Sequence, residues 1–179
     1  QTCALPISTE DYHTPNAVSF DPIRAKQLLQ EAGYGGSKKL RVTLLSTDRE
    51  VSKRLSEAYQ DMWKKHLDAE VSIEQREWKT YLSRMSELDY QLALGGWIGD
   101  YPDPTTFLDM WKKGDGNNRT GWHSEEYEKL LGKAELATDP AERIRLLRQA
   151  ETLFLNEHPI VPIYWHTSVY LLHDSVKNW

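Results

Sequence analysis

The sequence predicts an α/β fold, and three observations lead to this prediction. In residues 40–44 apolar side chains alternate with polar ones, which is the two-residue period of a strand. A helical pattern follows and continues to about Leu67, and Val71 with Ile73 then indicates a second short strand. A strand, a crossover helix and a strand imply parallel pairing, so we expect helices packed against an open parallel sheet.

Composition and charge exclude several other classes of protein. The 179 residues are 39% hydrophobic and 27% charged, which is typical of a globular chain. The net charge is −5 and the Lys and Arg residues are scattered, so we expect no nucleic-acid partner. Cys3 is the single cysteine and the six histidines are dispersed, so we expect no disulfide, no metal and no cofactor. No apolar run approaches the roughly 20 residues that span a bilayer, so we expect no membrane span.

The first elements can be placed by their capping residues. Residues 1–19 show no period and are interrupted by prolines, so we expect a linker or peripheral segment there. Asp21 is a good N-cap, Pro22 suits the first helical position, and Gly33 is expected to end this helix.

The crossover helix has its own start signal. Thr47 and Glu50 have the spacing of a capping box, which predicts that the helix begins between them. The residues at helical spacing, expected on its inner side, are Val51, Leu55, Ala58, Met62 and His66.

The second half of the chain alternates helices, loops and short strands. A helix is expected from Glu77 to Met85 and a third strand from Tyr90 to Gly96. The later expected elements are a short helical stretch through Trp111, helices from Ser124 to Ala137 and from Asp139 to Phe154, and strands over Ile160–Trp165 and Val169–Leu172.

The catalytic patterns tested do not occur in the sequence. Gly116 and Gly121 have the spacing of a phosphate-binding loop, but Trp122 stands where that loop requires lysine. The patterns of serine hydrolases, zinc proteases and dinucleotide-binding proteins are missing. These three enzyme classes therefore have no support in the sequence.

Aromatic residues give the first indication of a binding site. Trp63 and Trp111 lie within helical periods and are expected in the core, whereas Trp97 and Trp122 lie in loops, where binding groups are often presented. The loop after the third strand would lie at the carboxyl end of a parallel sheet, where such sheets bind ligands. We therefore expect a site in residues 95–104, although its two aspartates are also residue types that shape turns.

Several longer motifs occur in a fixed order along the chain. They are Phe20-Asp21-Pro22, Glu77-Trp78-Lys79-x-Tyr81-Leu82, Gly96-Trp97-Ile98-Gly99-Asp100-Tyr101-Pro102-Asp103-Pro104, Asn117-Asn118-x-Thr120-Gly121-Trp122, and Pro159-Ile160-Val161-Pro162-Ile163-Tyr164. In this order they resemble the C-terminal part of the oligopeptide- and dipeptide-binding proteins of bacterial ABC importers, the family 5 solute-binding proteins.

The resemblance implies a fold and a function. The fold would be the C-terminal lobe of a two-lobed type II periplasmic-binding protein, formed by residues 20–164, with residues 165–179 starting the return to the other lobe. The complete protein would be a monomeric, extracytoplasmic or periplasmic receptor, and not an enzyme, that closes on a peptide and passes it to membrane permease subunits. The absence of an initiator Met and of a signal sequence agrees with our expectation that the chain is a piece of a longer polypeptide.

The resemblance also implies ligand-binding residues. Asp100 matches the aspartate that pairs with the α-ammonium group of a peptide. The other positions expected in the cleft are Trp97, Trp78, Gly96, Ile98 and Tyr101. Three positions depart from the best-known oligopeptide-binding proteins, since Leu94 and Met85 replace arginines and Ser52 replaces a histidine.

Two alternatives stay open at the level of the sequence. One is a receptor of the same fold for another solute, such as a nickel chelate, a sugar or an opine, because a fold does not fix a ligand. The other is a small enzyme that uses Asp100 and Asp103 as an acid pair, although no nucleophile or metal set accompanies them.

Overall fold

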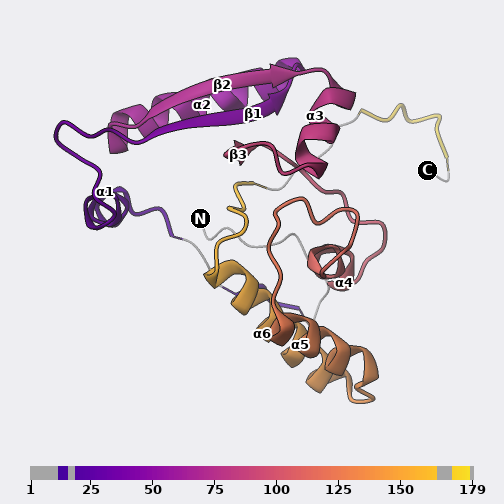
Figure 1. Ribbon diagram of the computed structural model, residues 1–179. Helices are drawn as coiled ribbons and strands as arrows, with labels where there is room; N and C mark the ends of the chain where they lie inside the picture. The colour runs from indigo at the N-terminus through magenta and orange to yellow at the C-terminus, as the bar shows by residue number, and fades with distance from the viewer. Residues whose placement is uncertain (1–11, 16–18, 165–170, 178–179) are drawn as a thin grey trace.

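The computed structural model describes residues 12–15, 19–164 and 171–177. A sheet with its covering helices lies at one end of the molecule, and a group of helices lies at the other (Figure 1). The elements, in order, are α1 (Pro22–Glu31), β1 (Arg41–Thr47), α2 (Glu50–Leu67), β2 (Glu70–Arg76), α3 (Trp78–Ser86), β3 (Leu92–Ala93), α4 (Thr105–Leu108), the 3-10 helix η1 (Asp109–Trp111), α5 (Glu125–Leu136) and α6 (Pro140–Asn156).

The sheet confirms the α/β prediction. Its strand order is β2-β1-β3, and both neighbouring pairs are parallel. Leu44 of β1 lies opposite Ile73 of β2 and Leu92 of β3, so apolar side chains share one level of the sheet. The parallel β1–β2 pair is possible because α2 crosses over between these strands and packs against both (Figure 1).

The predicted N-cap of α1 is confirmed, whereas α2 begins at Glu50 without the predicted capping box. The Asp21 carboxylate accepts a hydrogen bond from the Arg24 amide at 2.8 Å, and Pro22 is the first residue of α1. Thr47 instead belongs to β1, where it lies opposite Arg76 of β2, because strand pairing continues to this residue. Its hydroxyl is 2.8 Å from the hydroxyl of Ser52, and α2 begins without a side-chain cap.

The inner face of α2 is rotated from the predicted one. Val51 and Met62 are exposed, whereas Ser56 is fully buried. Gln60 also faces the sheet, since its side-chain amide donates to the carbonyl of Val71 at 2.5 Å. The helical period was correct, but small and polar residues lie against the strands, and Ser56 permits a close approach of the helix.

The third strand is shorter than predicted. It comprises only Leu92 and Ala93, although the Leu94 amide still donates to the Leu45 carbonyl at 2.8 Å. Beyond Leu94 the chain leaves β1, so the backbone has no further strand to pair with. The apolar residues 160–164 and 171–172 form no strand, and the rest of the two predicted C-terminal strands lies outside the described residues.

The largest core lies among the helices of the other end of the molecule. Its buried residues from α4, η1, α5 and α6 include Leu108, Trp111, Tyr127, Leu131, Leu147 and Phe154. Trp111 stacks on Phe154 with 4.8 Å between ring centroids, which confirms its predicted core position, while Trp63 is only half-buried. Tyr12 joins this core and donates a hydrogen bond to the buried Glu151 carboxylate at 2.7 Å.

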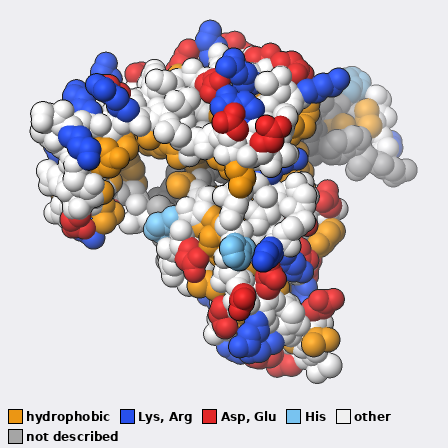
Figure 2. Space-filling model, viewed as in Figure 1, with side chains coloured by type: hydrophobic (Ala, Val, Ile, Leu, Met, Phe, Trp, Pro, Cys, Tyr) orange, Lys and Arg blue, Asp and Glu red, His pale blue; other side chains and the backbone are white. Residues whose placement is uncertain are grey.

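The two ends of the molecule leave an uneven surface between them. Figure 2 shows one face hollowed between the α1 region and the helical group, with hydrophobic side chains along the edge of the hollow. Exposed apolar residues in α1 and α2 include Ile23, Leu28 and Met62. The segment that joins the sheet to the helical group is the one in which a site was expected.

Candidate functional site

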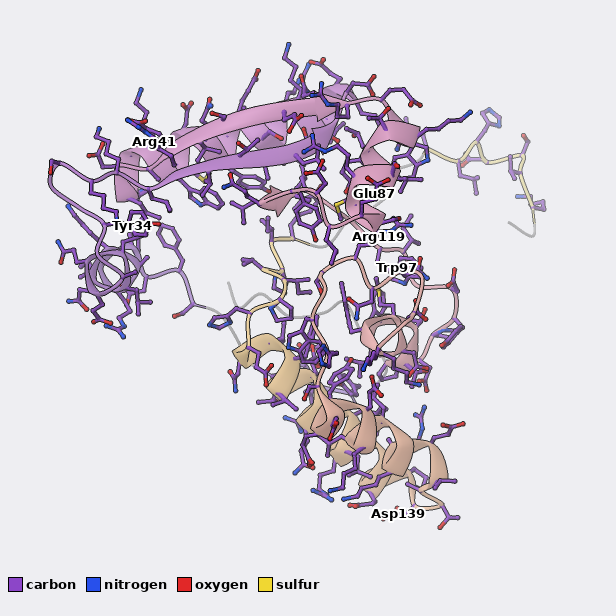
Figure 3. All side chains as sticks on the ribbon, viewed as in Figure 1. Tyr34, Arg41, Glu87, Trp97, Arg119 and Asp139 are labelled. Atoms are coloured by element: carbon purple, nitrogen blue, oxygen red, sulfur yellow. The ribbon has the colours of Figure 1, made fainter. Side chains whose placement is uncertain are left out.

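Residues 94–104, here called the site segment, lead from the sheet to the helical group. The segment begins where Leu94 pairs with β1, and it ends at the buried Pro104 before α4. All residues from 95 to 102 are exposed. The site segment is therefore held at both ends and presents its middle to solvent (Figure 3).

Contacts with α4 fix the backbone of the site segment. The indole Nε1 of Trp97 donates to the carbonyl of Thr106 at 2.9 Å, and the Asp100 amide donates to the Thr106 hydroxyl at 2.9 Å. A Cβ atom on Gly99 would lie 3.0 Å from the Phe107 ring and 3.1 Å from the Thr106 methyl group. Glycine at position 99 thus permits the close approach that brings Trp97 and Asp100 to one short helix.

The two aspartates of the site segment have different environments. Both carboxylate oxygens of Asp103 accept hydrogen bonds from Arg143 at 2.9 Å, and one also accepts from the Thr105 amide and hydroxyl. Burial alone would raise the pKa of Asp103, but the hydrogen bonds from Arg143 and Thr105 lower it to about 2. Asp103 therefore shapes and anchors the turn, as the structural interpretation of this loop predicted.

Asp100 carries a carboxylate that is free to bind. Its side chain is exposed, and within the described ranges it has no hydrogen-bond or ion-pair partner. The backbone of the same residue is held by Thr106. An exposed carboxylate on a held backbone, without a partner among the described residues, suits a cationic ligand.

An aromatic pair on α3 lies next to the beginning of the site segment. Trp78 stacks on Tyr81 with 5.7 Å between ring centroids, and the guanidinium of Arg49 lies over the Trp78 ring at 5.3 Å. The Tyr81 hydroxyl donates to the Leu94 carbonyl at 3.0 Å. Trp78 is thus connected to the site segment through Tyr81. No pattern in the sequence predicted that Arg49 is a neighbour of Trp78.

The other expected site residues are exposed or open to solvent. Ile98 is 80% exposed, Tyr101 is about half exposed, and no atom lies within 4 Å of the position a Cβ would take on Gly96. The Tyr101 hydroxyl accepts a hydrogen bond from the Thr105 hydroxyl at 3.3 Å. These residues are available for contacts, and their roles in binding stay predictions.

Trp122 was expected to present a binding group, and the structure corrects this. Its ring meets the edges of Tyr127 and Phe154 with centroid distances of 5.1 Å. Its Nε1 donates to the Glu157 carboxylate at 2.6 Å. The residue lies in a loop, but the loop folds onto the helical core, so Trp122 is a packing residue.

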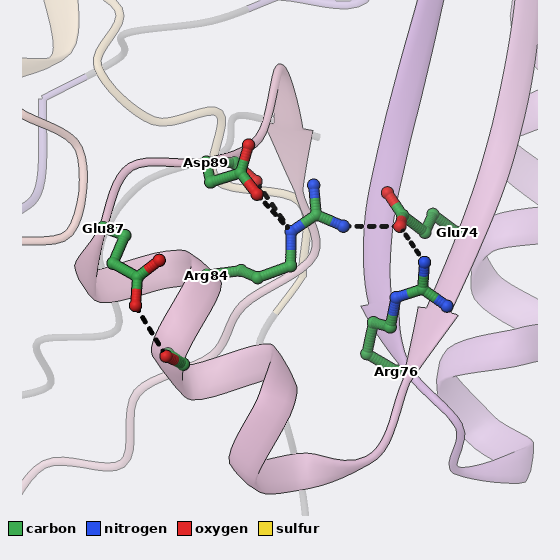
Figure 4. A network of polar contacts seen from close by, with 6 residues as sticks. Glu74, Arg76, Arg84, Glu87 and Asp89 are labelled. Carbon is green, nitrogen blue, oxygen red and sulfur yellow. Dashed lines mark hydrogen bonds and ion pairs between the residues drawn. The ribbon is translucent and has the colours of Figure 1, made fainter.

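An ion-pair network holds α3 against the sheet (Figure 4). Arg84 pairs with Glu74 of β2 and, at 2.9 Å, with Asp89 beyond the end of α3. Glu74 also pairs with Arg76. The sequence offered no signal for this network, because its members come from different elements and meet only in the folded chain.

The described residues show neither a metal centre nor a membrane helix. Within the described ranges, no three His, Cys, Asp or Glu side chains are grouped so that they could hold a metal ion. No helix in the described part of the chain combines the length and the apolar character that crossing a membrane requires.

Comparison with known families identifies the class of protein. Residues 3–119 match the family model of the middle part of the bacterial extracellular solute-binding proteins, family 5, and the chain therefore belongs to this family. Members of this family are receptors and not enzymes, in agreement with the prediction from the sequence. The family resemblance drawn from the motifs is confirmed.

Individual relatives are about one-third identical to the chain over the aligned residues. The oligopeptide-binding protein OppA of Bacillus subtilis is 34% identical over 171 residues, which are 94% of this chain and 31% of the relative. The dipeptide-binding protein DppE of the same organism is 35% identical over 87% of this chain and 29% of its own length. The chain therefore spans less than a third of the length of these relatives.

Solved structures of relatives have the same fold over most of the chain. The murein tripeptide binding protein MppA of Escherichia coli superposes with a TM-score of 0.81 at 30% identity, covering 89% of this chain and 32% of that one. Haemophilus influenzae OppA in complex with the peptide RPPGFSPFR gives a TM-score of 0.76 at 32% identity, covering 79% and 28%. The predicted fold class, a lobe of a type II periplasmic-binding protein, is confirmed.

Proposed function

We propose that this chain is part of the substrate-binding component of an ABC importer for peptides. Relatives that match most of the chain are named for binding oligopeptides, dipeptides or murein peptides. Residues 20–164 would form the C-terminal lobe, and residues 165–179 would start the return to the other lobe. The complete receptor would be a monomer outside the cytoplasm that delivers its peptide to permease subunits in the membrane.

The single observation that carries the peptide assignment is the free carboxylate of Asp100 on a fixed backbone. Every unmodified peptide has an α-ammonium group, and an ion-paired hydrogen bond to it would hold the peptide in register without reading its sequence. Trp97 and Trp78 would line the cleft with flat walls that accept varied side chains. Gly96, Ile98 and Tyr101 would contribute backbone and wall contacts along the same cleft.

The first experiment identifies the ligand. The full-length receptor that contains this chain is purified from its own cells without denaturation, and its bound material is weighed by native mass spectrometry. A series of different peptide masses is the expected result. A single non-peptide mass would contradict the peptide assignment and leave Asp100 with a different partner.

The second experiment tests the role of Asp100. Asp100→Asn in the full-length receptor should weaken binding of a peptide with a free amino terminus by about 10- to 100-fold, because a charge-assisted hydrogen bond is lost. Binding of the same peptide after N-acetylation should change little, as measured by calorimetry.

The control for this experiment is Asp61→Asn. Asp61 is an exposed aspartate on α2, away from the site segment. This variant should bind both peptides like the wild type. Equal losses for the free and the acetylated peptide in Asp100→Asn would rule out the ammonium contact.

A further inference from the structure

Arg119 is a partly buried arginine whose side chain has no ion-pair partner in the described part of the chain. Its Nε is buried and donates no hydrogen bond to any residue that the structure describes. No ion pair to its guanidinium occurs among the described residues, although the two other partly buried arginines of the described ranges, Arg84 and Arg143, are both paired. Arg119 is partly buried, and a guanidinium with one N–H out of contact with water and without a partner favours binding of an anion.

The backbone around Arg119 is rigid. The side-chain amide of Asn118 donates to the carbonyls of Trp111 and Trp122 at 3.0 and 2.9 Å. The Tyr90 hydroxyl donates to the carbonyl of Arg119 itself. The unpaired guanidinium therefore extends from a loop whose backbone is held by hydrogen bonds.

The same loop lies against the connection between α3 and β3. A Cβ atom on Gly121 would lie 2.9 Å from a methyl group of Leu88, which shows how closely the two segments approach. Tyr90, whose hydroxyl is bonded to the Arg119 carbonyl, lies two residues before the start of β3. The loop is thus placed beside the strand from which the site segment emerges (Figure 3).

The positive charge of Arg119 acts on Tyr81, the residue that stacks on Trp78 beside the site segment. Burial raises the pKa of Tyr81, and the positive charge of Arg119 opposes this rise. The Tyr81 hydroxyl is bonded to Leu94 at the start of the site segment, and its ring stacks on Trp78. Arg119 therefore lies on the Tyr81 side of the site, at the beginning of the site segment, while Asp100 lies six residues further along.

We infer that the guanidinium of Arg119 binds a carboxylate of the ligand. This inference rests on the proposed function, because it takes the ligand to be a peptide whose ammonium group lies at Asp100. The site then presents the Asp100 carboxylate in the middle of the site segment and the Arg119 guanidinium near its beginning, and these two opposite charges match those of a peptide. Neither Leu94 nor Met85 carries a charge, so neither of them can take this role.

The test measures affinities of the full-length receptor by calorimetry. The probes are tri-, tetra- and penta-alanine, each as the free acid and as the C-terminal amide, together with Ala-Glu-Ala amide. The wild type should bind the best free acid about 10- to 100-fold more tightly than its amide. If the carboxylate is that of a ligand side chain, Ala-Glu-Ala amide should instead bind more tightly than tri-alanine amide by a similar factor.

The variants assign this preference to one residue. Arg119→Met should remove the advantage of the carboxylate-bearing peptide and leave amide binding within about twofold, whereas Arg119→Lys should restore part of the preference. Arg148→Met, which removes an exposed arginine of α6, should behave like the wild type.

The outcomes separate this inference from the proposed function. In one outcome the wild type binds alanine peptides equally well as acids and as amides, and gains nothing from the glutamate side chain. This result would overturn the role of Arg119 and leave the proposed peptide-binding function intact. A carboxylate preference that survives in Arg119→Met would also overturn the role of Arg119 without affecting the proposed function. Failure of the wild type to bind any of these peptides would count against the proposed function itself.

Discussion

Asp100 and Asp103 are the same residue type three positions apart, and their surroundings give them different roles. Asp103 is held by Arg143 and Thr105, whereas Asp100 faces solvent with a fixed backbone. An enzyme that used both as an acid pair would need two available carboxyl groups. The engagement of Asp103 with Arg143 therefore argues against that alternative.

The Asp103–Arg143 pair gives a prediction about pH. The pKa of Asp103 in the folded protein, about 2, lies below its ordinary value of 3.8. The carboxylate therefore contributes its full stability above about pH 4, and this contribution is lost as the pH falls toward 2.

The variant Asp103→Asn tests this prediction. It should lower the free energy of unfolding of the full-length receptor by about 1–2 kcal/mol at pH 7, after allowing for solvent screening of a pair that is about one-third exposed. The difference from the wild type, measured by denaturant unfolding at several pH values, should shrink between pH 4 and pH 2. A difference that stays constant over this range would contradict the ion pair.

At the scale of elements, the important contact is the one between the site segment and α4. Trp97 and Asp100 are both bonded to Thr106, and Gly99 lies too close to Phe107 to carry a side chain without a shift of its neighbours. A short helix of the core thereby positions a loop that is otherwise exposed. Precision of this kind is required when a site must hold one charged group in place.

Gly99→Ala should disturb this contact. The added methyl group would press on the buried Phe107 ring, so we expect a loss of roughly 1–3 kcal/mol in the free energy of unfolding. Peptide affinity should fall as well, because the Asp100 amide is moved away from Thr106. Unfolding by denaturant and calorimetric titration with a peptide measure the two effects.

Gly116→Ala is the matched control for this substitution. Nothing lies within 4 Å of the position that its Cβ would take. We expect wild-type stability and affinity for it. If Gly99→Ala behaved in the same way, the close approach to α4 would have no part in positioning the site.

At the scale of the whole molecule, the site segment joins the sheet end of the chain to the helical group (Figure 1). It is the exposed connection between two packed regions, and the chain spans less than a third of its relatives. A second lobe in the complete receptor would close on the face that carries this segment, as two-lobed receptors close around a ligand.

This arrangement predicts where a peptide changes hydrogen exchange. In the full-length receptor, a saturating peptide should slow exchange of the backbone amides of residues 95–101, because closure removes them from water. The connection between α5 and α6, residues 137–139, should exchange at an unchanged rate and serves as the internal control. Protection that is absent from residues 95–101 would contradict the placement of the ligand.

The sequence by itself determined the α/β class, the parallel order of the first two strands, the capped start of α1 and the family. These follow from local patterns, such as apolar periods and capping residues, or from motifs that are contiguous along the chain. The site segment was found for the same reason, since its residues are neighbours in sequence.

Only the tertiary structure decided which residues of these elements are buried, which are paired and which are free to bind. The buried side of α2, the short third strand and the packing of Trp122 depend on neighbouring elements that no local pattern describes. The pairing of Asp103 with Arg143, forty residues away, and the isolation of Arg119 depend on which distant side chains meet. Charge alone does not separate a bound carboxylate from a free one, because that difference is made by partners which only folding brings together.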